Sequence, residues 1–435
     1  MQALISSKPH ISVGEIADVT DGIHTSIDYD EKSKINLISA TSPRQNYFNL
    51  SREAYISSKA HDANPRTALR VNDVIISTVG TIGNCAVVDE SILPANSDRH
   101  VGIIRTKNTI DPYTLSTFLL TKYGRNQTIR EATGNVQLNL FLYKIREITV
   151  PLFSEQFQNK IRKVVNRAHE FLHESECLYS EAEKLIDNEI GIDIDSIDKD
   201  ASTIKSFSES FGNSGRLDAE YYQLSSYRIM DMLNAGGTIA TLCHFYDTNF
   251  MPKKTEKYRY IELANVGKKG EIEDVDIFYG DALPTRARRL VKKGNIIVSS
   301  IEGSLSSCAL ITDMFNDSLC STGFYVIDSE YYNSETLLVI LKSKVVQHLL
   351  KRGCSGTILT NISREEFLNI PLPKISSEMQ YKIRNIISDT YNMRNKGKEL
   401  IGSAIHILEL AIEQDEDRAM KWLEDYNVEL DKCYS

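Results

Sequence analysis

The feature that most constrains the fold of this chain is a nine-residue pattern that occurs twice, half a chain apart. The stretches FQNKIRKVV, from Phe157, and MQYKIRNII, from Met379, share Q-x-K-I-R followed by apolar residues. Their first residues are 379 − 157 = 222 positions apart in a chain of 435 residues. Self-similarity at a fixed offset is the sequence signature of a repeated structural unit. We therefore expect other segments of the two halves to match at this offset.

Four further pairs of segments match in the same order along the chain. Their offsets are 222 or 223, as for Ser77 and Ser299 (299 − 77 = 222) and for Cys85 and Cys308 (308 − 85 = 223). Short β-branched runs that follow a turn are typical of buried strands. The five matches predict a duplicated unit, a mixed α+β domain followed by a long helix. The four further pairs are NDVIIST with GNIIVSS, GNCAVV with SSCALI, ATGNVQLNL with CSGTILTNI, and ITVP with IPLP.

Both expected helices carry seam residues at alternating steps of four and three. This spacing indicates a coiled coil rather than an ordinary amphipathic helix. About 32 residues at a rise of ~1.5 Å make each helix roughly 45–50 Å long. We expect the helices to pair antiparallel within the chain; the alternatives are that each packs on its own domain or pairs between chains. The apolar seam residues are Phe157, Ile161, Val164, Phe171, Leu178 and Leu185 in the first helix, and Met379, Ile383, Ile386, Met393, Leu400 and Ile407 in the second.

These patterns predict an α+β protein with pseudo-two-fold symmetry, in which two tandem mixed α/β domains are separated by two long antiparallel coiled-coil helices. A chain of this length is too long for one hydrophobic core. The segment between the halves is acidic and then Ser-rich, which is typical of a linker. The expected boundaries are 1–153 for the first domain, 154–190 for the first helix, 191–214 for the linker, 215–375 for the second domain, 376–412 for the second helix and 413–435 for an acidic C-terminal tail.

The composition limits the class of protein. The formal net charge of −9 argues against a uniformly basic nucleic-acid coat but allows a local basic face. The seven cysteines include no C-x-x-C pair, so neither a zinc ribbon nor a disulfide scaffold is indicated. No apolar run approaches the ~20 residues that a membrane helix needs, and the start does not resemble a signal peptide. We expect a cytoplasmic protein with no membrane partner.

The common catalytic motifs are absent from the sequence, with one exception. There is no G-x-x-x-x-G-K-[ST] phosphate loop and no G-x-S-x-G nucleophile elbow. HEFLH, residues 169–173, satisfies H-E-x-x-H, which places two imidazoles one helical turn apart, as in zinc hydrolases. No dedicated third ligand is evident, and the second copy has Tyr391 and Asn395 where the first has His169 and His173. We expect no catalytic residue and no metal; a zinc-dependent hydrolase stays an alternative.

Side chains that suit DNA contacts gather in both domains. Arg suits guanine and Asn or Gln suits adenine in the major groove, whereas Lys mainly contacts phosphate. Paired DNA readers normally sit one helical turn, about 34–36 Å, or more apart, and helices of the expected length would suit that distance. The DNA-binding candidates are Arg44, Gln45, Asn46, Arg66, Arg70, Arg99, Asn135, Gln137, Lys253, Lys254, Lys268, Lys269, Arg286, Arg288, Arg289 and Arg352.

Four motifs along the chain form a recognisable set. They are GEIADVTDGIHTS from Gly14, the doubled strands DVIIS and NIIVS, GRLDAEYY from Gly215, and the two helix starts of the form P-L-x…E…Q-x-K-I. In this arrangement the chain resembles the specificity (S) subunit of a type I restriction-modification system, a form of phage defence. The resemblance covers essentially the whole chain. It implies two target recognition domains, each reading one half of a bipartite, asymmetric site in double-stranded DNA.

The resemblance also implies partners and cofactors. In that family the two central helices set the length of the unspecified spacer and dock two methyltransferase (M) subunits, which use S-adenosylmethionine to methylate adenine. Restriction (R) subunits, which depend on ATP and Mg2+, join the complex. The S subunit itself is not an enzyme and holds no cofactor of its own. A two-domain adaptor that binds proteins instead of DNA is a further alternative.

Overall fold

The computed structural model of the chain divides into two units. Unit 1 comprises Met1–His173 with Met393–Ser435, and unit 2 comprises Glu174–Asn392. The boundary falls inside both long helices, so each helix contributes one half to either unit. Mixed α/β structure, as predicted from the sequence, is confirmed in both units. The structure describes residues 8–50, 54–134, 138–197, 204–267, 269–273, 275–356 and 360–433.

Unit 1 is built on two small sheets with helices beside them. The first sheet has the strand order β2-β8-β5-β6 and is antiparallel throughout. The second has the order β4-β3-β7, in which β3 and β7 run parallel. The bounds are β2 (Ala17–Asp21), β3 (Ile35–Ile38), β4 (Ala54–Ile56), α3 (Ser58–Ala63), β5 (Val74–Ser77), β6 (Cys85–Val87), β7 (Ala95–Ser97), β8 (Val101–Thr106), α4 (Pro112–Leu120), α5 (Lys122–Glu131) and α6 (Leu142–Glu147).

Unit 2 repeats this arrangement, with β14 as an additional strand in its second sheet. Its antiparallel sheet has the order β11-β18-β15-β16, and its second sheet has the order β13-β12-β17-β14, with β12 parallel to β17. The sequence duplication is therefore a duplication of topology. The bounds are α9 (Leu224–Met232), β11 (His244–Tyr246), β12 (Lys257–Ile261), β13 (Asp276–Tyr279), β14 (Ala287–Leu290), β15 (Ile296–Ser299), β16 (Cys308–Leu310), β17 (Leu319–Ser321), β18 (Phe324–Asp328), α11 (Ser334–Lys342), α12 (Lys344–Gly353) and α13 (Arg364–Leu368).

Each unit also closes with a short antiparallel pair of strands. β1 pairs with β9 in unit 1, and β10 pairs with β21 in unit 2. The last strand of each pair leads directly into a long helix, so this pair fixes where the helix starts. The bounds are β1 (His10–Ser12), α2 (Val13–Ile16), β9 (Thr149–Pro151), β10 (Ala235–Thr238), α10 (Ile239–Leu242), β19 (Cys354–Ser355), β20 (Asn361–Ile362) and β21 (Pro371–Pro373).

The glutamine that both copies of the Q-x-K-I-R pattern share has the same structural role in both units. Gln158 Oε1 accepts a hydrogen bond from the backbone N–H of Asp111, the N-cap of α4, at 2.7 Å. Gln380 Oε1 accepts the equivalent bond from Asn333, the N-cap of α11, at 3.0 Å. The pattern thus ties the first turn of each long helix to the neighbouring helix of its own unit.

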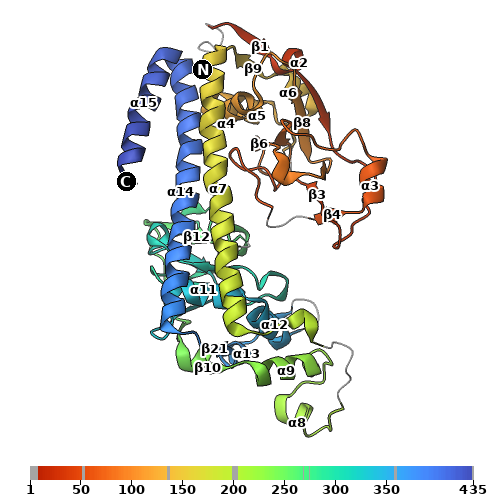
Figure 1. Cartoon of the computed structure of the whole chain (residues 1–435), viewed down its shortest axis with the longest axis vertical. Helices are drawn as coiled ribbons and strands as arrows, with labels where there is room; N and C mark the ends of the chain where they lie inside the picture. The colour runs from red at the N-terminus through yellow and green to blue at the C-terminus, as the bar shows by residue number, and fades with distance from the viewer. Residues whose placement is uncertain are drawn as a thin grey trace. The chain divides into compact units, whose positions relative to one another are not determined.

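The long helices α7 (Glu155–Ile190) and α14 (Ser377–Glu413) pair in opposite directions within unit 1 (Figure 1). Near the start of α7, the backbone N–H of Ser154 donates to Glu416 at 3.0 Å. Further along α7, a Cβ built on Gly397 would lie 2.9 Å from the carbonyl oxygen of Ala168. The two helices therefore run antiparallel: residues later in α7 lie beside residues earlier in α14. In unit 2, the second half of α7 and the first half of α14 likewise share one apolar cluster, through Ala182 and Ile383 among others.

The seam positions expected from the heptads are all buried or half-buried, but the buried face is wider than the heptads imply. Phe171, Leu178 and Leu185 are half-buried, whereas Tyr179 and Ile186, one position further on, are 1% and 0% exposed. The reason is that each helix packs on the helices of its own unit as well as on the other long helix. Each long helix therefore packs on its unit, which was the expected alternative, and also pairs with the other long helix.

The C-terminal segment is a helix rather than an acidic tail. Residues Glu416–Cys433 form α15, and Ala419 and Leu423 are buried in the core of unit 1. Asp417, Glu424 and Asp425 are exposed on this helix. In the expected linker, short helical turns occur at Ile194–Ser196 and in α8 (Phe211–Ser214).

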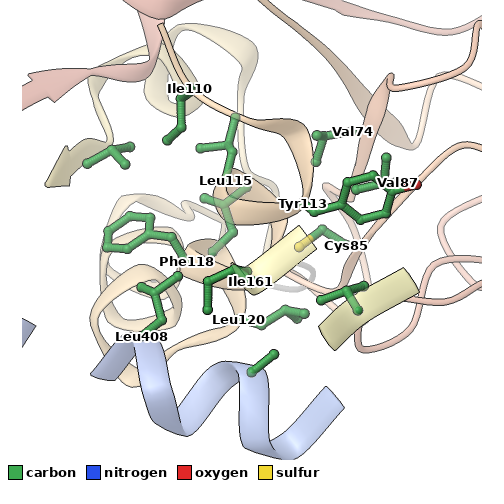
Figure 2. Close-up of a cluster of buried hydrophobic side chains, with 14 of the residues drawn as sticks. Val74, Cys85, Val87, Ile110, Tyr113, Leu115, Phe118, Leu120, Ile161 and Leu408 are labelled. Carbon is green, nitrogen blue, oxygen red and sulfur yellow. The ribbon is translucent and has the colours of Figure 1, made fainter. Parts of the chain in front are cut away.

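The core of unit 1 is where the long helices join the small sheets. Cys85 and Val87 of β6 lie in the same apolar cluster as Phe118 and Leu120 of α4. Ile161 of α7 and Leu408 of α14 complete it from the helical side (Figure 2). Burial at about 25 cal/mol per Å² of apolar surface makes such a shared cluster a strong tie between sheet, α4 and the helix pair.

Candidate nucleic-acid interface

The largest group of predicted contact residues that the structure brings together lies around the antiparallel ribbon β12–β13 in unit 2. The register pairs Lys257 with Tyr279 and Arg259 with Ile277. All four side chains are exposed, because alternate residues of a strand point to opposite faces. The Lys257 Nζ lies 5.0 Å from the centre of the Tyr279 ring. One face of the ribbon thus presents two cations beside an aromatic and an aliphatic side chain.

The opposite face of the ribbon is buried and holds it in place. Tyr258 and Tyr260 are 8% and 5% exposed and belong to a cluster with Leu319 of β17. The Tyr258 hydroxyl donates to Glu256 at 2.9 Å and accepts from the backbone N–H of Lys253 at 3.1 Å. The exposed face is therefore carried by a ribbon whose position is determined by packing and hydrogen bonds.

Two of the predicted lysines lie directly beside this ribbon. The segment with Lys253 and Lys254 approaches Gly280 so closely that a Cβ there would be 2.1 Å from the carbonyl oxygen of Lys253. Both lysines are exposed. The Lys253 Nζ donates to Glu256 at 2.8 Å, and this hydrogen bond raises the pKa of Lys253, so its positive charge persists above neutral pH.

The arginines of β14 lie at the other edge of the same sheet. The carbonyl oxygen of Arg288 accepts from the backbone N–H of Phe250 at 2.8 Å, which connects β14 to the lysine-bearing segment. Arg286 is exposed and Arg288 is half-buried. Arg289 points the other way, toward the buried Cys320, because it pairs with that residue in the register. Arg286 and Arg288 remain candidates, whereas Arg289 lies between the sheets.

Two further predicted residues of unit 2 contact other parts of the same unit. Arg352 donates to the carbonyl oxygen of Tyr221 at 3.0 Å, and its guanidinium lies 4.0 Å from the centre of the Tyr221 ring. Arg216 covers the same ring at 4.1 Å and donates to Cys354 at the end of α12 at 2.6 Å. Lys269 lies 3.8 Å from Glu176 of α7. The structure therefore gives Arg352 a structural role, whereas Lys269 forms only a partly exposed surface pair and stays a candidate.

Unit 1 gathers its cations at the ends of β2 and β7. Arg66 is 62% exposed in its side chain and donates to Thr20 at 2.5 Å. The backbone N–H of Ile23 donates to Ser97 at 2.8 Å, which brings the residues after β2 against those after β7. Arg99 follows β7 and is exposed. His24 extends from the same place, with its Nε2 2.6 Å from Asp21.

The segment SPRQNYF places its three predicted residues differently. Asn46 is 0% exposed, and its side-chain amide donates to Thr117 at 2.9 Å and accepts from Ser116. The prediction of a DNA contact by Asn46 is therefore wrong, because a left-handed turn, with φ of 58°, directs it inward. Arg44 is half-buried and Gln45 is exposed. Arg70, in the turn before β5, is also exposed. Asn135, Gln137 and Lys268 lie outside the described residues.

The H-E-x-x-H motif does not form a metal site. The His169 Nε2 is hydrogen-bonded to the carbonyl oxygen of Asn46. His173 is exposed on the helix surface, and Glu170 pairs with Arg167 at 2.6 Å. Within the described part of the chain, no group of three or more His, Cys, Asp or Glu side chains could hold a metal ion. The zinc reading is not favoured, because one imidazole is already used to support the turn at Asn46.

Comparison with known proteins gives structural matches alone. No protein-family model and no curated protein matches this chain. Two of the solved structures that match it are S subunits of type I restriction-modification systems. The S subunit from M. genitalium is 13% identical, with a TM-score of 0.39, over 93% of this chain and 94% of its own. The HsdS subunit from Thermoanaerobacter tengcongensis is 12% identical, with a TM-score of 0.30, over 93% and 96%.

A third match comes from work on the complex assembly and conformational transition of the type I system. It is 14% identical, with a TM-score of 0.30, over 93% of this chain and 97% of its own. The family that the sequence resembles is thus also named by these structures. Since every one of these TM-scores lies below 0.5, the functional argument rests on the residues and contacts of this chain. No helix in the described part of the chain is long and apolar enough to cross a membrane.

None of the four residues that face outward on the β12–β13 ribbon was among the DNA-binding candidates predicted from the sequence. Of the four, Lys257 belongs to a visible basic run. The alternation K-Y-R-Y from Lys257 was the available signal, because it places cations on one face and tyrosines on the other. The sequence of β13 gives no such signal, because only the register shows that Ile277 and Tyr279 lie beside Arg259 and Lys257.

Proposed function

We propose that this chain is the non-catalytic DNA-specificity subunit of a type I restriction-modification complex. The observation that carries the proposal is the duplication of one fold within one chain. The two units share the strand order of the antiparallel sheet, a parallel strand pair in the second sheet and the same glutamine anchor for a long helix. A duplicated fold with different surface side chains suits two readers of two different half-sites in one asymmetric DNA sequence.

The surface chemistry of each unit supports DNA as the ligand. Unit 2 presents lysines and an arginine around an exposed ribbon, and unit 1 presents Arg66 and Arg99 at one end of its sheets. Lys and Arg neutralise phosphates and release counterions, which supplies affinity without sequence preference. The net charge of −9 is compatible with this role, because partner subunits would contribute much of the phosphate contact.

The two long helices would set the spacer between the half-sites and dock two methyltransferase subunits. α7 has 36 residues and α14 has 37, and each crosses from one unit into the other. The partners would be double-stranded DNA, two M subunits that use S-adenosylmethionine, and R subunits that use ATP and Mg2+, in the cytoplasm. This chain would supply recognition and no bond-making step, in keeping with the structural role of His169.

The direct test is to co-express the chain with the M subunit of a type I system and map adenine methylation by sequencing. We expect one split sequence with a fixed spacer. Methylation of every site that contains either half alone would contradict the two-reader proposal. Salt-insensitive binding of the complex to DNA, or none, would favour the alternative of a protein-binding adaptor. Stoichiometric zinc in the purified chain would favour the alternative of a zinc-dependent hydrolase.

A second test addresses the helices. Deletion of one heptad from both α7 and α14 removes about 10 Å of helix, which corresponds to roughly three base pairs at ~3.4 Å each. We expect the preferred spacer to shorten while both half-sites stay the same. An unchanged spacer in a folded, active complex would contradict the role given to the helices.

A further inference from the structure

The exposed face of the β12–β13 ribbon has the chemistry of a base reader as well as that of a phosphate contact. Lys257 and Arg259 occupy alternate positions of one strand, and Ile277 and Tyr279 lie opposite them. Ile277 is 59% exposed and Tyr279 is 51% exposed, although both are large apolar side chains that folding normally covers. A surface that combines exposed apolar groups with cations in this way is typical of an interaction site.

The ribbon also has the shape that such a site requires. β13 is the edge strand of its sheet, so the β12–β13 pair forms a margin of unit 2. The major groove of B-DNA is about 12 Å wide and admits a two-stranded antiparallel ribbon. Because Tyr258 and Tyr260 are packed in the sheet, the opposite face is held rigidly enough to place its side chains.

The positive charges around the ribbon are placed to contact the DNA phosphates on either side of a major groove. Lys254 is exposed next to the ribbon end, and Lys253 lies beside it. Lys253 pairs with Glu256, whereas the described residues include no ion-pair partner for the Arg259 guanidinium. Arg259 is therefore available for the fork-shaped contact to O6 and N7 of guanine, which is the commonest specific contact in the major groove.

We propose, on the basis of the function proposed above, that the β12–β13 ribbon of unit 2 enters the DNA major groove of one half-site. Arg259 contacts a guanine edge, and Ile277 contacts the methyl group of a neighbouring thymine. Lys254 and Lys257 contact phosphates on the flanking backbone. The ribbon then specifies which bases unit 2 recognises at some positions of its half-site.

Unit 1 carries different side chains on the corresponding ribbon. Ile38 of β3 and Ile261 of β12 are the residues buried between the two sheets of their units, which places Asn36 where unit 2 has Arg259. The β3–β4 register pairs Asn36 with the exposed Tyr55. Asn36 is uncharged, and its side-chain amide donates to the carbonyl oxygen of Ile92 at 2.8 Å, so this position in unit 1 has no guanidinium for a guanine. A change at Arg259 is therefore expected to affect only one half of the split site.

The test uses the complete complex with its methyltransferase subunits. Arg259→Gln is expected to lower methylation and binding about tenfold to a hundredfold at sites with guanine at one position of one half-site, and to relax the preference there. Lys254→Ala is expected to weaken binding uniformly and to lower the salt slope by about 1. Arg228→Gln, an exposed arginine on α9 of the same unit, is the matched control and should change neither.

A second reader variant and the wild type separate the possible outcomes. Ile277→Ala should relax a thymine position in the same half-site, so the inference is also tested if Arg259→Gln fails to fold. If both variants fold and keep the wild-type methylation motif, the ribbon inference is overturned, while the split-site motif of the wild type still supports the proposed function. If the wild-type complex methylates no split site, the proposed function fails and the inference fails with it.

Discussion

Gln158 Oε1 accepts a hydrogen bond from the backbone N–H of Asp111 at 2.7 Å, and 222 residues later Gln380 makes the same bond to Asn333. This relationship explains the glutamine of the repeated Q-x-K-I-R pattern. The glutamine also donates to a carbonyl just before its own helix, Phe153 in unit 1 at 2.9 Å. It therefore holds the angle at which the long helix leaves its unit.

The first prediction concerns this bond. Gln158→Leu removes the acceptor of the Asp111 N–H in a half-buried site, so we expect a loss of about 1–3 kcal/mol in the free energy of unfolding. Urea unfolding followed by circular dichroism measures it. Gln156→Leu, at an exposed position of the same helical turn, is the control and should change stability by less than about 0.5 kcal/mol. Equal effects of both variants would show that the bond has no special role.

The second prediction concerns the close approach of α7 and α14 in unit 1. A Cβ on Gly397 would lie 2.8 Å from Leu172 and 2.9 Å from the Ala168 carbonyl oxygen. Gly397→Val should therefore force the helices apart and destabilise the fold by about 1–3 kcal/mol or more. Gly402→Val lies on the same helix in open space and should be neutral or stabilising, because glycine is a poor helix former. Thermal unfolding of the two variants distinguishes them; a harmless Gly397→Val would rule out close helix packing at this point.

The third prediction concerns a largely buried ion pair in unit 1 between Arg105 of β8 and Asp73, the residue before β5. Arg105 donates to Asp73 at 3.0 Å, and the Asp73 side chain is only 4% exposed. Burial raises the pKa of Asp73 despite the partial compensation from Arg105. Asp73→Asn should cost about 3 kcal/mol of stability, because the Arg105 charge would be left without its counter-charge. Asp18→Asn removes an exposed pair with Lys107 and should cost less than about 1 kcal/mol; similar losses in chemical denaturation would refute the distinction.

The fourth prediction concerns pH and the carboxylates of α7 in unit 2. Burial raises the pKa of Glu183 above its ordinary value, although Lys269 and Lys342 oppose the shift. A group whose pKa is raised on folding stabilises the fold below its unfolded pKa and loses that contribution as the pH rises through the folded value. Wild-type stability should therefore fall as the pH rises above the ordinary glutamate pKa of about 4.5, and Glu183→Gln should abolish this fall.

The matched control for this variant is Glu181→Gln, at an exposed position of α7. It should keep the pH dependence of the wild type. Unfolding midpoints measured from pH 4 to pH 8 give the comparison. A Glu183→Gln profile that parallels the wild type would mean that the carboxylate is not desolvated in the folded state.

The fold could be predicted to a considerable extent because its signals are local. The β-branched runs around Ser77 and Ser299 indicate strands through their immediate neighbours, and the heptads indicate α7 and α14 in the same way. The C-terminal helix was missed because its acidic residues dominate the composition, while only a few apolar residues such as Leu423 anchor it. The wider buried face at Tyr179 was missed because a heptad describes contact with one partner helix only.

The sequence by itself determined that the chain contains one fold twice, with a long helix after each copy. Only the tertiary structure decided which side chains remain available at the surface. Asn46 is not available because its side chain donates to Thr117, 71 residues away. Arg352 is not available because it donates to the carbonyl oxygen of Tyr221, 131 residues away. Arg259 instead emerges on an exposed ribbon through its pairing with Ile277. Periodicity depends on neighbours in the sequence, whereas the accessibility of a polar side chain depends on partners that only folding brings to it.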